Sequence, residues 1–491
     1  MISGKNKFYI TTAIPYVNAR PHLGHALEFV QADVIARYHR AKGEDTTLLS
    51  GGDENALKNV HAAEEAGVPL RRFIDTNTAL FADLAKRLNV QFNVFQRGSD
   101  EKHHYPSSQE LWRRCDKAGD IYKKLYQGLY CVGCETFYAP DELTESGECP
   151  EHPGRKLDTV SEENYFFQLS KYRERLREII TADALRIVPA HRKNEVLAFL
   201  ESPLEDISIS RSNERAKNWG VPVPGDDTQR IYVWFDALNI YQSGVGFGWD
   251  ERQYKKWWPA DVHLIGKGII RFHAVYWPAF LLSAGLSLPK SLYVHGYLTV
   301  DGKKMSKTVG NVVDPFELVQ KYGVDPVRYY LLREIPSGED GDFSIAKFEA
   351  RYNGELANGL GNLVARVVTL AAKLKTKNEK GNSTVQSEKL RNELDSTQQQ
   401  YANSIAEFRL NEALEHIWRL VRVSDQYIND ERPWEEEKPA VIHDLLFVIL
   451  RIAELLKPFL PETAEKIQGQ IAYGDGIFEI KKSGNLFPRL E

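Results

Sequence analysis

The stretch Pro21-His22-Leu23-Gly24-His25 stands where a short β-rich run, 7–14, meets a segment of helical periodicity, 24–42. In that segment apolar residues recur every three or four positions, as on the buried face of a helix. A second apolar run, 46–49, ends in Gly51-Gly52-Asp53, and helical patterning resumes after it. Alternating strands and helices predict a parallel sheet with nucleotide-sized crevices at the ends of its strands.

The strand–helix alternation is interrupted once and later gives way to helices. It breaks from about 116 to 227, and after 348 the pattern is nearly all helical, apart from a polar break at 376–387. We therefore expect an α/β fold with a doubly wound parallel sheet split by an insertion, followed by an all-α domain. Strand-like runs return after the insertion at 231–235, 262–265 and 291–294. The expected boundaries are 1–115 and 229–325 for the two halves of the sheet domain, 116–228 for the insertion, 326–350 for a connecting stem and 351–491 for the helical domain.

Length and composition indicate an ordinary soluble protein of two or three domains. The chain has 491 residues, of which 42% are hydrophobic and 27% charged, and it exceeds the length that one hydrophobic core usually supports. It contains no apolar run long enough to span a bilayer and no signal-peptide pattern at its start, so we expect no membrane association and a cytoplasmic location. The net charge of −5 means that any RNA must be bound through local basic patches and stacking.

The His22-Leu23-Gly24-His25 motif lies at the expected N-terminus of a helix, where free backbone N–H groups favour an anion. Gly24 would let a nucleotide approach the backbone, and the imidazoles of His22 and His25 can donate hydrogen bonds to a phosphate in a transition state. Two ordinary turn histidines are the alternative, and the motif alone does not decide between them. The chain has no G-x-x-x-x-G-K-[ST] pattern, so an ATP site here would not be a P-loop.

A second motif, Gly302-Lys303-Lys304-Met305-Ser306-Lys307-Thr308, combines three lysines with small hydroxyl residues. Such a loop can close over a triphosphate and neutralise the charge that develops as pyrophosphate leaves. The alternative is a solvated surface loop. Met305 is the only methionine besides Met1, which favours a functional loop.

A third motif is Cys131-x2-Cys134, then fourteen residues, then Cys149-x2-His152. Three thiolates and one imidazole in two paired turns predict a tetrahedral zinc site, and four protein ligands make it structural because no position stays open for catalysis. In an intracellular chain, clustered cysteines favour metal binding over disulfides. Cys115 lies outside this motif, and we expect it to be a buried thiol.

These motifs together resemble a known family. His22-Leu23-Gly24-His25 is similar to the HIGH signature of class I aminoacyl-tRNA synthetases, and 304–308 is similar to their KMSKS signature. Within that class the chain resembles the methionyl-tRNA synthetases of the single zinc-knuckle type over essentially its whole length. The further matching stretches are Ala13-Ile14-Pro15-Tyr16-Val17-Asn18, Ile231-Tyr232-Val233-Trp234-Phe235-Asp236-Ala237 as a second-half strand, Ile265-Gly266-Lys267 and Phe272-His273.

The resemblance implies that methionine and ATP react to methionyl-adenylate without a covalent enzyme intermediate. The methionyl group then passes to the 3′ end of methionine tRNA, initiator and elongator, and Mg²⁺ accompanies ATP. The implied ATP-binding residues are His22, Gly24, His25, Lys304, Ser306 and Lys307. Of these, His22, His25, Lys304 and Lys307 would stabilise the charge of the transition state and are the implied catalytic residues.

The resemblance also implies a methionine pocket and an acidic partner for the α-ammonium group of the substrate. The implied pocket residues are Ala13, Ile14, Tyr16, Trp234, Ala237, Tyr241, Phe272 and His273, and the acidic partner is Asp53. Aromatic walls suit an unbranched thioether, because sulfur makes favourable contacts with aromatic rings. Without the resemblance, this aromatic set reads as ordinary core.

In the helical domain, Asn362 and Arg366 are four residues apart and so project from one helix face. Trp434 follows Pro433 at an expected helix end. The resemblance makes these three the anticodon readers, with planar polar groups for base edges and an indole for stacking. A surface pair and a core tryptophan are the alternative. We expect a monomer, because the extra C-terminal tRNA-binding domain through which some relatives dimerise is absent from the sequence.

The sequence departs from the family pattern in two places, and two other readings stay open. Gly52-Asp53-Glu54-Asn55-Ala56 stands where the family usually has Thr-Asp-Glu-His-Gly, and Gly268 replaces an aspartate expected near the ribose of ATP. The first alternative is a class I synthetase for cysteine or a branched aliphatic amino acid. The second is a paralogue that binds tRNA but has lost activation.

Overall fold

The computed structural model describes residues 6–133, 136–138, 142–152, 154, 157–304, 313–373, 384–475 and 477–490. Its contacts divide the chain into two compact units. The first, here called the sheet unit, comprises Met1–Pro21, His39–Lys86 and Gln91–Val294. The second, the helical unit, comprises His22–Tyr38, Arg87–Val90 and His295–Glu491.

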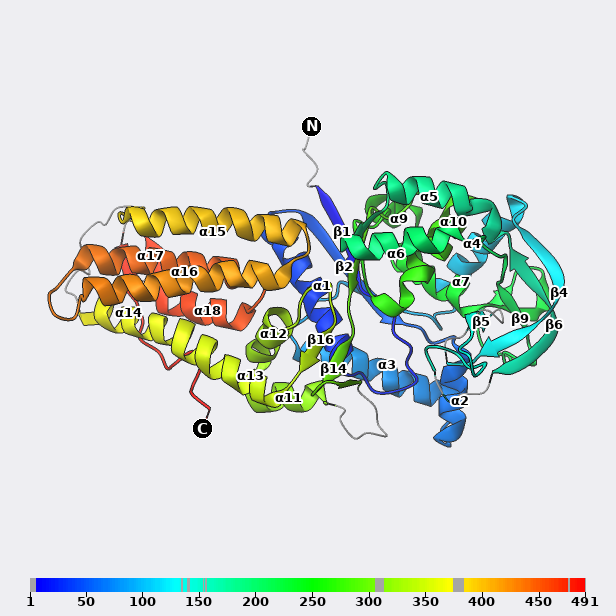
Figure 1. Cartoon of the computed structure of the whole chain (residues 1–491), viewed down its shortest axis with the longest axis horizontal. Coiled ribbons are helices and arrows are strands. Elements are labelled where there is room, and N and C mark those ends of the chain that lie inside the picture. Colours follow the sequence, from blue (N-terminus) through cyan, green and yellow to red (C-terminus); the bar gives the residue numbers. More distant parts are fainter. Residues whose placement is uncertain are drawn as a thin grey trace. The chain divides into compact units, whose positions relative to one another are not determined.

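The sheet unit is built on a six-stranded sheet in the order β3-β2-β1-β12-β13-β7. The neighbouring strands β1 and β2 are labelled in Figure 1. The pairs β1–β2, β1–β12, β2–β3 and β13–β7 are parallel, which confirms the predicted parallel sheet. The strand order reverses between β1 and β12, and in open α/β sheets ligands bind at the carboxyl ends of the strands beside such a point. The bounds are β1 Lys7–Thr11, β2 Asp45–Gly52, β3 Val94–Arg97, β7 Arg186–Val188, β12 Val262–Gly266 and β13 Ser291–His295.

Helices join the strands of this sheet. One long helix, α1, follows β1, and its bounds agree with the predicted helix at 24–42. The segment between β12 and β13 contains a five-residue π-helical turn, η4, a wider geometry that often occurs at functional sites. The bounds are α1 Leu23–Ala41, α2 Leu57–Glu65, α3 Leu70–Arg87, η3 Lys267–Ile269, η4 Phe272–Tyr276 and α10 Trp277–Ser283.

Between β3 and β12 the chain forms two small antiparallel sheets, in the orders β5-β4-β6-β8 and β10-β11-β9. One short strand of this region, β7, instead adds to the edge of the central sheet, which the sequence did not predict. The predicted boundary at 115/116 lies inside α4, and the domain limits stay predictions. The bounds are α4 His104–Lys117, β4 Ile121–Cys131, β5 Thr136–Tyr138, β6 Asp158–Phe167, η2 Leu169–Tyr172, α5 Arg173–Thr181, α6 Ala190–Glu201, β8 Ile207–Ser208, β9 Ser210–Ser212, β10 Pro222–Val223 and β11 Asp226–Ile231.

The predicted strand at 231–235 is wrong. β11 ends at Ile231, Tyr232 is extended, and the helix α7 (Val233–Leu238) begins directly after it. α8 (Ile240–Ser243) and α9 (Glu251–Trp257) follow. Every residue of α7 is buried, so its continuous apolar run has no polar face, and periodicity cannot separate a buried strand from a short buried helix.

The helical unit confirms the predicted all-α C-terminal part, with one exception. A hairpin of β17 and β18 follows the last helix, and Tyr473 and Phe478 pair across it with ring centroids 4.7 Å apart. The unused sequence signal was Asp475-Gly476, a common two-residue turn. The bounds are β14 Leu298–Val300, β15 Lys303–Lys304, α11 Pro315–Tyr322, α12 Val324–Arg333, β16 Gly341–Phe343, α13 Ile345–Arg351, η5 Tyr352–Gly361, α14 Asn362–Lys373, α15 Glu388–Ala406, α16 Leu410–Glu431, α17 Pro439–Leu456, α18 Pro461–Gln470, β17 Ile471–Gly474 and β18 Ile477–Ile480.

A completely buried guanidinium joins α1 to the C-terminal helices of this unit. Arg328 of α12 forms an ion pair with Asp33 of α1 at 2.9 Å. Its remaining N–H groups donate to the carbonyl oxygens of Leu88, Pro458 and Phe459 at 2.8–3.0 Å. A buried charge is tolerated only when it is paired and hydrogen-bonded, so these five residues fix α1 against α12 and the α17–α18 turn.

Across the residues that the structure describes, no helix combines the length and the apolar character needed to cross a membrane.

Candidate active site

Six of the nine residues predicted to bind methionine follow strands of the central sheet, and Trp234, Ala237 and Tyr241 lie in α7 and α8. Ala13, Ile14 and Tyr16 follow β1, Asp53 follows β2, and Phe272 and His273 follow β12. Tyr16 and Asp53 continue the parallel pairing beyond the strands as an isolated bridge, and the Asp53 N–H donates to the Pro15 carbonyl at 2.9 Å. The sheet therefore brings distant parts of the sequence to one edge.

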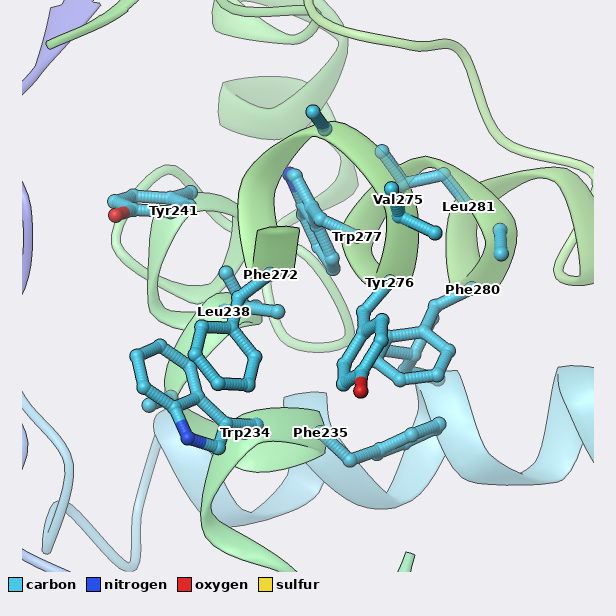
Figure 2. Packing of buried hydrophobic residues seen from close by; sticks show 14 of the residues in the cluster. Trp234, Phe235, Leu238, Tyr241, Phe272, Val275, Tyr276, Trp277, Phe280 and Leu281 are labelled. Atoms are coloured by element: carbon cyan, nitrogen blue, oxygen red, sulfur yellow. The ribbon is translucent and has the colours of Figure 1, made fainter. Parts of the chain in front are cut away.

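Stacked aromatic rings form the centre of this group. Trp234 of α7 lies parallel to Phe272 with ring centroids 3.6 Å apart (Figure 2). Tyr16 meets Trp234 edge-on at 6.2 Å. Both stacked rings are more than nine-tenths buried, and Ala13, Ile14, Ala237 and Tyr241 belong to or pack against the same apolar cluster. The structure thus brings the predicted apolar residues together.

A hydrogen-bond relay fixes the polar side of the group. His273 donates through Nδ1 to the Ile269 carbonyl at 2.9 Å, so its Nε2 accepts from the Tyr241 hydroxyl at 2.8 Å. Burial lowers the pKa of His273 to about 4, so the ring is neutral at pH 7. Tyr9 donates to the Tyr241 carbonyl at 2.6 Å, which holds the backbone of α8 against β1.

A buried carboxylate that the sequence did not single out ties these elements together. Asp236, between Trp234 and Ala237 on α7, accepts hydrogen bonds from His104 at 2.9 Å, Ser108 at 2.7 Å and Asn55 at 2.7 Å. Asn55 stands where the family usually has histidine, and its amide also donates to the Gly98 carbonyl at 2.7 Å. The available signal was an acidic residue inside the apolar run 231–238, because such a residue needs partners when buried.

The segment that carries Asp53 is held from several sides. The Glu54 carboxylate is fully buried and accepts from Arg97 at 2.8 Å, Thr78 at 2.6 Å and the Ser99 N–H at 3.1 Å. Asn59 donates to the Asp53 carbonyl at 2.8 Å. These bonds leave the backbone of Asp53 little freedom.

The His22-Leu23-Gly24-His25 motif belongs to the helical unit, where it forms the first turn of α1. The His22 N–H donates to Nδ1 of His25, and the Gly24 N–H donates to Nδ1 of His22, both at 3.1 Å. A backbone N–H can only donate, so both Nδ1 atoms are unprotonated acceptors and both rings carry their proton on Nε2. A β-carbon at Gly24 would lie 2.9 Å from the His22 ring, so glycine is needed here to admit the ring.

Both histidines are neutral at physiological pH. Burial lowers the pKa of His25 well below its usual range, and positive charge on His22 or His295 would lower it further. Desolvation lowers the pKa of His22 to about 4, although part of the side chain reaches solvent. Protonation of either Nδ1 would also break a hydrogen bond from the backbone. Each ring is therefore a neutral imidazole that carries its proton on Nε2.

The lysine-rich loop is carried by a small three-stranded sheet in the order β15-β14-β16. Asp301 and Gly302 have positive φ values of 48° and 73°, as a tight hairpin turn requires. The Asp342 carboxylate accepts from the Gly302 N–H at 2.8 Å and from the Thr299 hydroxyl at 2.6 Å. Lys304 is the last residue of β15, and its side chain, together with Ser306 and Lys307, lies outside the described residues.

Three of the four predicted zinc ligands lie together. The ligand atoms of Cys131, Cys149 and His152 are within 4.8 Å of one another, and His152 Nδ1 is 3.8 Å from each sulfur. Bond lengths of about 2.3 and 2.0 Å place sulfur and nitrogen ligands of tetrahedral zinc roughly 3.5 Å apart, so the arrangement fits zinc. Cys134, the fourth predicted ligand, lies outside the described residues.

Cys115 is separate from this cluster, as predicted. Its sulfur is buried and lies 3.6 Å from the Phe280 carbonyl. Burial raises the pKa of this thiol to about 12. Cys115 is therefore an inert core residue.

The predicted anticodon residues occupy one face of the helical unit. Asn362 is exposed at the start of α14, and the Arg366 guanidinium lies 5.3 Å from the centroid of the Trp434 ring. Asp425 and Asn429 of α16 accept from Arg366 at 2.8 and 2.7 Å. Trp434 is 48% exposed, which excludes the alternative of a core tryptophan.

Gly268 occupies the middle of η3 and is exposed. It follows β12 at the carboxyl edge of the central sheet. The aspartate that the family commonly has at this position would place a carboxylate at that edge. The chain offers no side chain at that point.

Comparisons with known proteins agree with this geometry. A family model described as tRNA synthetases class I (M) matches residues 8–158 and 153–368, and one described as anticodon-binding domain of tRNA ligase matches 387–482. The chain therefore belongs to the class I tRNA synthetases, with a catalytic sheet domain and a helical anticodon-binding domain, and is an aminoacyl-tRNA ligase.

Individual relatives narrow the family. The methionine--tRNA ligase of Thermotoga maritima is 41% identical over 95% of this chain and 75% of its own length, and that of Brucella suis is 40% identical over 94% and 91%. The structure of Mycobacterium tuberculosis methionyl-tRNA synthetase in complex with methionyl-adenylate matches with a TM-score of 0.93 and 37% identity, covering 99% of this chain and 100% of that chain. Within its class, the chain belongs to the methionine--tRNA ligase family.

The neutral state of the two motif histidines can be measured. We expect the NMR signal of the His22 ring to titrate near pH 4 and that of His25 to stay unchanged from pH 7.5 to 5.5, with His22→Gln and His25→Gln spectra providing the assignment. Because an unfolded histidine binds its proton near pH 6.5, the contribution of these rings to stability is complete above that pH and is lost as pH falls toward 4. Titration of both rings at 6.5 would contradict the assigned tautomers.

Proposed function

We propose that the chain activates methionine with ATP to form methionyl-adenylate and then transfers the methionyl group to the 3′ end of methionine tRNA. The observation that carries the proposal is the cluster of aromatic rings beside the switch point of the sheet, where Trp234 stacks on Phe272 and Tyr16 meets Trp234 edge-on. Trp234, Phe272 and Tyr16 offer flat apolar walls for an unbranched side chain, and a thioether sulfur gains from such contacts. Asp53, beside Tyr16 at the end of β2, is the proposed partner of the substrate α-ammonium group.

The alternatives of another amino acid or of a non-enzyme fit less well. A cysteine enzyme would be expected to bind its substrate thiol to the metal itself, whereas the four candidate ligands Cys131, Cys134, Cys149 and His152 would leave no open position on a tetrahedral zinc. A branched aliphatic substrate has no sulfur and would gain nothing from the sulfur–aromatic contacts that these rings can offer. A paralogue without activity would have no need to keep the hydrogen-bonded geometry of His22 and His25.

In the activation step, the methionine carboxylate attacks the α-phosphorus of ATP, a carboxylate–phosphorus bond forms, and pyrophosphate leaves with the electrons of the broken bond. We propose that His22 and His25 donate through Nε2–H to phosphate oxygens near Gly24, and that Lys304, Ser306 and Lys307 neutralise and hold the polyphosphate. The histidines thus supply neutral donors and the lysines supply charge. Mg²⁺ would arrive with ATP and be held mostly by nucleotide oxygens. Gly268 implies that the ribose contact is weaker than in relatives with an acid there.

The zinc site, Cys131, Cys134, Cys149 and His152, is proposed to be structural, holding the turns at the end of β4. The proposal further includes the domain limits given above, a monomeric chain and a cytoplasmic location, where charged tRNA is consumed.

Methionine specificity is tested by exchange of labelled pyrophosphate into ATP with a panel of amino acids. We expect exchange with methionine, weaker exchange with norleucine and homocysteine, and rejection of cysteine, leucine and valine. A one-methylene difference in an apolar pocket is worth only about 1–3 kcal/mol, so rejection of the near analogues should be incomplete. Faster exchange with cysteine, leucine or valine would overturn the proposal.

Anticodon reading is tested at Trp434. We propose that its exposed indole stacks on an unstacked base of the CAU anticodon, while Asn362 and Arg366 bond to base edges and so select among bases. Trp434→Ala should lower aminoacylation efficiency roughly ten- to hundredfold, because stacking is worth about 1–3 kcal/mol per base. Trp434→Phe, which keeps a π-face, should lose less. Methionine-dependent pyrophosphate exchange should be unchanged in both, and equal loss in the two assays would assign Trp434 to folding instead.

The metal site is tested by metal analysis of purified protein. We expect one zinc per chain in the wild type and in Cys115→Ser, and none in Cys149→Ser. Cys149 lies in the ligand cluster and Cys115 does not. The Cys115 variant controls for the loss of a buried thiol as such. Active wild-type protein without zinc, or a Cys149→Ser variant that retains it, would refute the site.

A further inference from the structure

Lys58 stands between the methionine pocket and the metal cluster, both within the sheet unit. It is the second residue of α2, and its ammonium nitrogen lies 3.0 Å from the centroid of the Tyr16 ring. The same nitrogen donates to the carbonyl oxygen of Gly133 at 3.4 Å. One side chain therefore contacts a wall of the pocket and the turn that carries the zinc ligands.

The Gly133 end of this link depends on the metal cluster. Gly133 lies between Cys131 and Cys134 in the sequence. A β-carbon on it would come within 2.7–2.8 Å of three atoms of the His152 ring, so its backbone already touches the imidazole ligand. The position of the Gly133 carbonyl is therefore coupled to that of His152. The pairing of Cys131 with Thr136 already brackets this turn, and a bound metal would add a further restraint by drawing the cysteines and His152 together.

The Tyr16 end of the link is part of the methionine pocket. Tyr16 meets Trp234 edge-on, Trp234 stacks on Phe272, and the backbone of Tyr16 bridges to Asp53. A cation over an aromatic face is attracted by the ring quadrupole, and the attraction fixes the plane of the ring. A shift of the Lys58 ammonium would therefore release Tyr16 and change the pocket beside Trp234.

We propose that Lys58 is a positioning residue that makes methionine affinity depend on an occupied metal site. This inference rests on the proposed binding of methionine at Tyr16, Trp234 and Phe272. With metal bound, the Gly133 carbonyl holds the Lys58 ammonium over Tyr16 and the pocket is preorganised. Without metal, the turn loosens and the Lys58 ammonium moves with it. Tyr16 then becomes ordered only when methionine binds, and the cost of ordering it lowers the affinity for methionine. Loss of zinc, by chelation or by oxidation of its thiolates, would thereby reduce amino-acid binding.

The test compares methionine binding by isothermal titration calorimetry in metal-loaded and chelator-treated protein, with zinc content measured on each sample. In the wild type we expect removal of zinc to weaken methionine binding roughly three- to thirtyfold, the range of a desolvated cation–π contact. Lys58→Met should bind methionine more weakly by a similar factor while retaining zinc. Chelation should then produce little further loss, because the link is already broken. In steady-state kinetics this variant should raise KM for methionine and leave kcat and KM for ATP near wild type.

Two further variants separate the link from a general structural effect. Lys58→Arg keeps a cation for the ring and a donor for Gly133, so it should restore most of the coupling. Lys217→Met removes another lysine that contacts α2, through its 2.5 Å ion pair with Glu64, and should leave both the affinity and its zinc dependence unchanged. Lys58→Gln serves as a second probe if Lys58→Met is poorly folded.

The outcomes are distinct. Wild-type affinity in Lys58→Met, or an unchanged effect of chelation in that variant, would overturn the link, since zinc would then act through another route or not at all. Coupling lost in Lys217→Met as strongly as in Lys58→Met would likewise overturn it. A wild-type protein that binds no methionine even with zinc would instead refute the proposed function.

Discussion

The position of α7, which carries Trp234 and Ala237, depends on the buried carboxylate of Asp236. Its partners come from two other segments, so that with α7 three segments meet: His104 and Ser108 come from α4, and Asn55 from the loop after β2. Leaving such a carboxylate without one of these donors costs more than an ordinary hydrogen bond gains. The three segments must therefore keep their distances, and Trp234 and Ala237, on either side of Asp236 in α7, are held with them. Asn55 replaces the histidine usual in the family and serves as a donor both to Asp236 and to Gly98.

Features that depend on the spacing of neighbouring residues could be predicted from the sequence. Features that depend on contacts between residues far apart in the chain could not. The first strand and α1, the cysteine and histidine pattern, and the exposed helix face with Asn362 and Arg366 all follow from residues close together in the chain. The Asp236 network could not be predicted, because its donors lie far apart in sequence. The same reason explains β7, whose few residues become a strand only beside β13. The prediction of a strand at 231–235 was wrong for another reason. An element that is buried on all sides has no polar face, so the spacing of its apolar residues does not distinguish a strand from a helix.

The two histidines of the first motif are neutral and are oriented by backbone hydrogen bonds. Their Nδ1 atoms accept backbone N–H groups of their own turn, which selects the Nε2–H tautomer and disfavours protonation. The first turn of α1, which the motif itself forms, thus orients both imidazole rings. Gly24 is required because a side chain at this position would collide with the His22 ring. In the proposed mechanism, these neutral donors would orient the polyphosphate and the lysines of the second motif would neutralise its charge.

The buried ion pair between Asp33 and Arg328 has a consequence for how the protein is made. α1, which carries the histidine motif, leaves the ribosome early, but the guanidinium that pairs with Asp33 comes much later, and the carbonyls of Pro458 and Phe459 that complete its hydrogen bonds come near the end of synthesis. Until then Asp33 has Arg37, four residues later in the same helix, as its cation. The contacts of α1 with α12 and the α17–α18 turn can form only after nearly the whole chain has been translated.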